Sequence, residues 1–95
     1  MKFIEFNIRY EAEQACAMYL NFRLEDNGNC TDGLLSLREV QSGWWQGSME
    51  VSEEYDHIQY GYELLCNGKP ACCEWERIPH RLRFNCVNDN YIVYD

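Results

Sequence analysis

Paired carboxylates are the first residues of this chain whose chemistry has to be weighed, because two acidic side chains can act as general acid and base. Two such pairs occur, Glu53 with Glu54 and Glu74 with Glu76. Glycosidase chemistry needs carboxyl groups about 5–9.5 Å apart across a cleft, with one pKa raised. The first pair is adjacent in an expected turn, and the second shares one face of an expected strand. Neither pattern indicates a cleft, so we expect no catalytic residue in this chain.

Cysteine and histidine are the candidates for metal or redox chemistry. The six cysteines are Cys16, Cys30, Cys66, Cys72, Cys73 and Cys86. No C-x2-C pair occurs, and His57 and His80 lie at no recognised ligand spacing from any cysteine. An even count can signal a disulfide framework in a short secreted chain, but the N-terminus lacks the layout of a signal peptide. We therefore expect free thiols, no metal and no cofactor, and a redox or metal protein is the most distant functional hypothesis.

Charge and hydropathy argue against two classes of partner. The chain carries 16 acidic and 8 basic residues, a net charge of −8. Affinity for nucleic acid rests mainly on Lys and Arg that neutralise phosphates, and anionic membrane surfaces attract the same residues. No apolar run approaches the roughly 20 residues of a membrane span, and a strand pattern begins next to Met1. We expect a cytoplasmic protein that binds neither nucleic acid nor membrane.

Short strands are the elements that must position any site. Apolar and polar residues alternate with the period of two that is typical of half-buried strands. The expected strands span residues 3–10, 16–22, 44–51, 58–64, 71–76 and 91–94, and a further strand begins at Leu35. Residues 25–33, EDNGNCTDG, have the composition of a flexible loop. Six to eight short antiparallel strands at this spacing predict one all-β domain over residues 1–95, an antiparallel β-sandwich of the immunoglobulin-like kind.

The richest stretch for function spans residues 58–84. Ile58, Tyr60, Tyr62 and Leu64 share one strand face, and Asn67-Gly68 suits a type I′ hairpin turn. The return strand covers 71–76, and Pro79 is expected to stop the ladder because it cannot donate a backbone hydrogen bond. This hairpin therefore ends in a run that carries an aromatic ring, a carboxylate and an imidazole.

That run reads W-E-x-x-P-x-R, formed by Trp75, Glu76, Pro79 and Arg81. It resembles the closing hairpin of the starch-binding modules called carbohydrate-binding module family 20. The order of elements is similar as well, with F-x-I-x-Y in the first strand, a Tyr in the second, Gly-Trp at a hairpin turn and Y-x-Y in the fifth. The chain looks most like the N-terminal modules of disproportionating 4-α-glucanotransferases.

The resemblance implies a function and a set of site residues. It implies a non-catalytic module that binds starch, glycogen or maltooligosaccharide, joined to a catalytic glucanotransferase domain beyond Asp95 of the same polypeptide. Trp75 would stack on a glucose ring, Glu76 and His80 would bind its hydroxyls, and Tyr19 matches a tyrosine of a second site. Trp44 faces outward by alternation, which fits either a binding ring or a contact with another domain, whereas Trp45 faces the core.

Departures from the family pattern support an alternative. The family's second platform Trp has no counterpart in residues 23–43, a usual Lys or Arg of the fifth strand is replaced by Gly61, and His80 stands in place of Asn. A degenerate module that has lost its sugar site would serve instead as a docking domain against its own enzyme or a neighbouring subunit.

Overall fold

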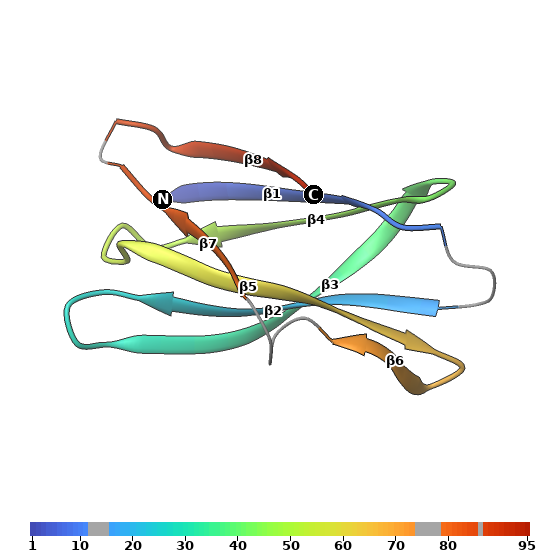
Figure 1. The fold of residues 1–95 in the computed structure, drawn as a ribbon. Coiled ribbons are helices and arrows are strands. Elements are labelled where there is room, and N and C mark those ends of the chain that lie inside the picture. The colour runs from blue at the N-terminus through green and yellow to red at the C-terminus, as the bar shows by residue number, and fades with distance from the viewer. Residues whose placement is uncertain (12–15, 74–78, 86) are drawn as a thin grey trace.

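The computed structural model describes residues 1–11, 16–73, 79–85 and 87–95 (Figure 1). The elements in these ranges are β1 (Lys2–Arg9), β2 (Cys16–Glu25), β3 (Cys30–Gln41), β4 (Trp44–Val51), β5 (His57–Cys66), β6 (Lys69–Cys73), β7 (His80–Arg83) and β8 (Asn90–Tyr94). The prediction of an all-β fold is confirmed, since no helix occurs in the described ranges. Within them, no helix is long and apolar enough to cross a membrane.

Two layers of strands form a sandwich, and β3 belongs to both (Figure 1). The first layer, here sheet one, has the order β3-β4-β1-β8, and sheet two has the order β6-β5-β2-β3 with β7 also paired to β5. Residues Cys30 to Leu37 of β3 pair with β2, and Arg38 to Gln41 pair with β4. A register shift between Glu39 and Gln41 accompanies the change of partner. One long strand therefore closes the sandwich along one side.

The core lies between the two sheets and consists of side chains that point inward from alternate positions along the strands. Its fully buried members are Ile4, Phe6, Leu20, Val51 and Ile58. The rings of Phe6 in β1 and Tyr60 in β5 meet at 5.0 Å between centroids, edge to face, a geometry that aromatic pairs favour. The four residues of β5 that alternation placed on one strand face are all buried, namely Ile58, Tyr60, Tyr62 and Leu64.

Strands β6 and β7 both pair with the same edge of β5. β6 pairs with its C-terminal part, Glu63 to Cys66, and β7 pairs with its N-terminal part, His57 to Tyr60. The turn between β5 and β6 has the positive φ angles of Asn67 (53°) and Gly68 (76°), as a type I′ turn requires. At the edge of the other sheet, β8 runs parallel to β1.

The structure differs from the expected elements in three places. Residues 25–33 form a tight hairpin rather than a long loop. The Asp26 N–H donates to the Asn29 carbonyl, the Asp26 carbonyl accepts from the Gly28 N–H, and the Asp26 carboxylate accepts from the Asn29 N–H. β6 begins at Lys69, two residues before the expected start of the return strand. β7, which the sequence did not lead us to expect, begins directly after Pro79 and pairs with another part of β5.

The expectation of free thiols was also wrong. Cys16 and Cys66 form a disulfide, with Cα atoms 4.2 Å apart. They are directly opposite each other in the antiparallel pairing of β2 and β5, where side chains of facing residues come close. Cys30, by contrast, is a free and exposed cysteine. Sequence spacing could not reveal this bond, because 50 residues separate its two partners.

We predict that Cys16→Ser combined with Cys66→Ser lowers the free energy of unfolding by about 2–4 kcal/mol, because the cross-link no longer restricts the unfolded chain. Urea unfolding measures this difference, and Cys30→Ser is the matched control with an expected change within about 0.5 kcal/mol. Equal midpoints for the double variant and the unaltered chain would refute the prediction.

The two adjacent tryptophans supply a second prediction. Trp45 is buried, and its Nε1 donates to the backbone carbonyl of Tyr10 at 3.1 Å, whereas Trp44 is only half-buried. We expect Trp45→Ala to cost about 3–5 kcal/mol through the cavity that it leaves. Trp44→Ala should cost about 1 kcal/mol or less. Comparable losses in thermal or urea unfolding would show that the assignment of core and surface is mistaken.

Candidate functional site

The W-E-x-x-P-x-R run lies partly outside the described residues. Trp75 and Glu76 belong to 74–78, of which the structure describes nothing, so their predicted roles stay predictions. By chain order, this segment joins β6 to Pro79 and β7. The described residues on both sides of the run pair with β5. The described strands that precede and follow the run, β6 and β7, thus lie at the same edge of sheet two.

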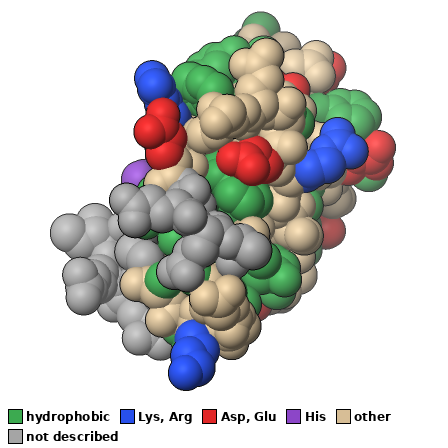
Figure 2. Space-filling model, turned by 90° about the vertical axis from the view of Figure 1, so that its right-hand side faces the viewer, with side chains coloured by type: hydrophobic (Ala, Val, Ile, Leu, Met, Phe, Trp, Pro, Cys, Tyr) green, Lys and Arg blue, Asp and Glu red, His purple; other side chains and the backbone are tan. Residues whose placement is uncertain are grey.

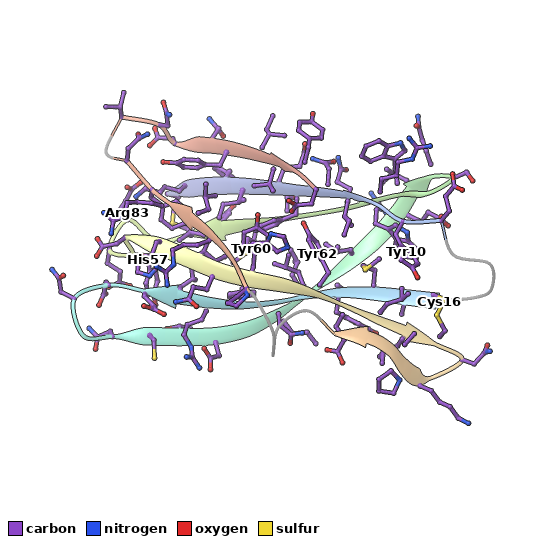
Figure 3. All side chains as sticks on the ribbon, viewed as in Figure 1. Tyr10, Cys16, His57, Tyr60, Tyr62 and Arg83 are labelled. Atoms are coloured by element: carbon purple, nitrogen blue, oxygen red, sulfur yellow. A yellow bond between two sulfur atoms is a disulfide. The ribbon has the colours of Figure 1, made fainter. Side chains whose placement is uncertain are left out.

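His80 begins β7 and lies on the inner face of sheet two, because its partner across the ladder is Tyr60. The imidazole stacks on the Tyr60 ring at 5.1 Å and meets the Tyr62 ring at 5.8 Å. Tyr60 and Tyr62 point from β5 into the sandwich (Figure 3), and each is only 4% exposed. These rings are covered, so they cannot serve as platforms for a sugar.

The hydroxyl groups of the same two tyrosines meet one carboxylate. The Tyr62 hydroxyl donates to Asp95 Oδ2 at 2.5 Å, and the Tyr60 hydroxyl lies 3.4 Å from the same oxygen. The backbone of Asp95 continues the pairing of β8 with β1, donating to the Asn7 carbonyl at 2.8 Å. His80, Tyr60, Tyr62 and Asp95 thus connect the two sheets, which is a structural role.

Tyr19 lies on the opposite face of sheet two from His80. It is half-buried, and its ladder partners on the outer face are Ser36 and Glu63. Beside it, the Asn21 amide donates to Glu63 Oε2 at 3.0 Å. Because the sheet separates Tyr19 from His80, the structure does not bring these two predicted site residues together.

Polar side chains on the outer face of sheet two are paired with each other. Arg23 donates twice to Asp32 across the β2–β3 ladder, at 2.6 and 3.0 Å. His57 lies in β5, and its side chain is only 17% exposed. Its Nε2 lies 3.1 Å from Glu25 Oε2. In the described part of this face, these polar side chains thus have partners within the protein.

Trp44 lies in the other layer, on the outer face of sheet one. The Arg9 guanidinium lies 5.9 Å from the centroid of its ring, and the two residues are ladder partners. Figure 2 shows the end of the molecule where β3 turns into β4, with hydrophobic groups interspersed among acidic and basic ones. Trp44 is therefore separate from His80 and from Tyr19, and the three described candidates do not form one site.

The outer face of sheet one holds exposed apolar side chains that the sequence analysis did not single out. Phe3 is 46% exposed, Ile92 is 60% exposed and Tyr94 is 71% exposed. Register places them on one face, because Phe3 pairs with Asn90 and Glu5 pairs with Ile92 in the parallel β1–β8 ladder. The alternation of β1 already turned Phe3 outward, and that was the available signal.

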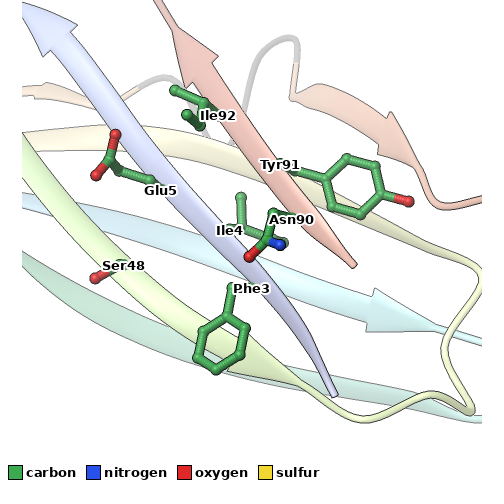
Figure 4. Close-up of a pocket in the computed structure, with 7 residues that line it drawn as sticks. All are labelled: Phe3, Ile4, Glu5, Ser48, Asn90, Tyr91 and Ile92. Atoms are coloured by element: carbon green, nitrogen blue, oxygen red, sulfur yellow. The ribbon is translucent and has the colours of Figure 1, made fainter. Parts of the chain in front are cut away.

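A groove of about 360 Å³ runs along this face (Figure 4). Its lining residues are Phe3, Ile4, Glu5, Ser48, Asn90, Tyr91 and Ile92. A smaller hollow of about 210 Å³ is lined by Lys2, Glu53, Tyr55, Asp56, Phe84 and Asn85. Among the described residues, no group of three or more His, Cys, Asp or Glu side chains could hold a metal ion.

The smaller hollow contains an ion pair of structural importance. Glu53 accepts from the Met1 ammonium at 2.6 Å and from Lys2 Nζ at 2.9 Å, and these hydrogen bonds lower the pKa of the Glu53 carboxyl to about 2. Lys2 is buried and its Nζ lies 5.6 Å from the centroid of the Phe84 ring. Lys2 thus contacts both Glu53 and the ring of Phe84, and these contacts hold β1 close to the end of β7.

Comparisons with protein-family models and with curated proteins found no match for this chain. The assignment of function therefore rests on the residues themselves and on their arrangement.

Glu53 supplies a prediction about acid stability. Its pKa is depressed from the ordinary value of 4.5 to about 2, so its stabilising effect is complete above pH 4.5 and disappears as pH falls towards 2. We expect Glu53→Gln to have a lower melting temperature than the unaltered chain at neutral pH. The difference should narrow below pH 4.5 and vanish near pH 2. Glu54→Gln is the control, and a difference between E53Q and the unaltered chain that does not change with pH would count against the ion pair.

Proposed function

We propose that this chain is a non-catalytic module that binds α-glucans, namely starch, glycogen or maltooligosaccharide. The observation that carries the proposal is the W-E-x-x-P-x-R run of residues 75–81, which connects two strands paired to one edge of β5. Trp75 supplies the ring for stacking and Glu76 supplies hydrogen-bonding groups, whereas His80 packs on the rings of Tyr60 and Tyr62. Trp44 and Tyr19 lie on other faces, so in this proposal they do not complete the same site.

The character of the chain fits a neutral ligand. A net charge of −8 disfavours nucleotides, phosphorylated peptides and other anions, because like charges repel. Glucose units carry no charge and present both hydroxyl groups and an apolar face. The single motif ring and its neighbouring polar groups match that combination.

The resemblance to the starch-binding modules of family 20 extends the proposal from this chain to the whole polypeptide. A 4-α-glucanotransferase domain joined to this module would act on glucan that the module holds nearby, since tethering raises the effective substrate concentration. The cytoplasmic location stays a prediction. The Cys16–Cys66 disulfide weighs against it, because such bonds persist mainly in oxidising compartments.

A docking domain without sugar affinity is the second candidate. The observation that favours it is the burial of Tyr60 and Tyr62, because the described part of the β5–β7 region then offers no exposed aromatic ring. In this alternative, the module contacts its own catalytic domain or a neighbouring subunit. The binding experiment below separates the two candidates.

We predict that the chain binds maltoheptaose with a Kd from about 0.1 mM to several mM, as one stacked ring and a few polar groups allow. Trp75→Ala should raise this Kd at least tenfold, which corresponds to about 1.4 kcal/mol, and abolish retardation in a glycogen gel. Circular dichroism should remain that of the unaltered chain.

Tyr10→Ala is the control, because it removes an exposed ring outside the motif. The proposal fails if the unaltered chain shows neither retardation nor chemical-shift changes with about 10 mM maltoheptaose, well above the expected Kd. The docking function would then replace it.

A further inference from the structure

The groove on the outer face of sheet one has the composition of a second ligand site. It spans three strands in register, with Glu5 of β1 facing Ser48 of β4 on one side and Ile92 of β8 on the other. Phe3 and Asn90 form the neighbouring pair, and each of these side chains is visible in Figure 4. Backbone hydrogen bonds in two ladders fix these positions, so the site is preformed rather than built from loops.

The apolar part of the groove comes from Phe3 and Ile92. Both side chains are largely exposed, although burial in a contact would stabilise them. Phe3 and Glu5 are two residues apart on one strand face, a separation of about 6.5–7 Å. An aromatic ring and a carboxylate at this separation can contact the apolar face and the hydroxyl groups of one pyranose ring.

The polar part of the groove has open hydrogen-bonding capacity. Glu5 Oε2 accepts from Asn7 Nδ2 at 3.2 Å, and Asn7 is itself held by the Val93 carbonyl at 3.2 Å and by Gln46 Nε2 at 3.1 Å. This network orients the Glu5 carboxylate. In the described part of the chain, Glu5 Oε1 and the side chains of Ser48 and Asn90 have no hydrogen-bond partner. One oriented carboxylate and two further polar side chains are thus available to a ligand.

The charge of the groove defines the class of ligand. Glu5 is its one charged lining residue, so an anionic ligand would be repelled. A purely apolar ligand would cover Glu5, Ser48 and Asn90 without replacing their hydrogen bonds to water, which is costly. A neutral, polyhydroxylated ligand with an apolar face satisfies both parts of the groove.

We propose that this groove is a second α-glucan subsite, in which Phe3 contacts the apolar face of a glucose unit and Glu5, Ser48 and Asn90 bind its hydroxyl groups. This inference rests on the proposed function, since it takes the same class of ligand. The groove lies on sheet one, and β6 and β7, the strands that precede and follow the motif run, lie at the edge of sheet two. One long glucan or two branches of glycogen can therefore engage both sites, which raises the overall affinity for polymers.

The test is an NMR titration of the full chain, in which backbone amide shifts are followed as maltoheptaose is added up to about 10 mM, above the expected Kd. We expect two sets of shifting amides, one near Phe3, Ser48 and Ile92 and one near His80. Phe3→Ala should raise the Kd of the first set at least about fivefold, because an exposed stacking ring is lost. Trp75→Ala should affect only the second set.

Tyr94→Ala is the matched control, since it removes an exposed ring from the same face outside the lining of the groove. Ser48→Ala is a second test variant that leaves the apolar contacts in place, and it too should weaken the first set. Shifts that are confined to the His80 region, or a first set that Phe3→Ala and Ser48→Ala leave unchanged, would overturn the subsite but not the proposed function. The subsite would also be overturned if Trp75→Ala lost the shifts of both sets. If the unaltered chain showed no shifts at all, both the subsite and the proposed function would be overturned.

Self-association of the unaltered chain that Phe3→Ala abolishes, without glycan shifts in the groove, would identify the face as a protein contact and overturn the subsite.

Discussion

Burial of one face of each sheet against the other is the constraint on which the rest of this structure depends. The Phe6–Tyr60 contact, 5.0 Å between ring centroids, joins β1 directly to β5 across the sandwich. Because successive side chains of a strand point to opposite faces, this packing sorts every residue of β1, β2 and β5 into an inner and an outer set. A shift of register by one residue would exchange the two sets, so core packing also determines which rings and which polar groups reach solvent.

The two outer faces that result differ in chemistry. On sheet two, Arg23 pairs with Asp32 and Asn21 pairs with Glu63, so cross-strand partners use up much of the hydrogen-bonding capacity. On sheet one, Phe3 and Ile92 are exposed beside polar groups that remain open. A weak, neutral ligand gains most where binding does not require existing pairs to break. This difference explains why sheet one is the face with the features of a recognition surface.

Polar contacts close the side of the sandwich where β7 and β8 lie. The Asp95 carboxylate accepts from Tyr62, which connects the end of β8 to β5. Lys2 bonds to Glu53 and lies near the ring of Phe84, and the Phe84 ring contacts that of Tyr91 at 5.4 Å between centroids. These contacts hold β7 in place, and β7 is the strand onto which the motif run leads.

The sequence by itself determined the fold class, the face of β5 that is buried, the turn at Asn67-Gly68 and the burial of Trp45, because alternation and turn chemistry are local properties of the chain. Features that depend on contacts between residues distant in sequence were decided only by the tertiary structure. Three features depend on the register between strands, which no local pattern encodes. They are the Cys16–Cys66 disulfide, the pairing of β7 with β5 and the change of sheet within β3. The same reason applies to function. Periodicity turned Phe3 outward, but its place beside Glu5, Ser48 and Asn90 follows from the two ladders that flank β1.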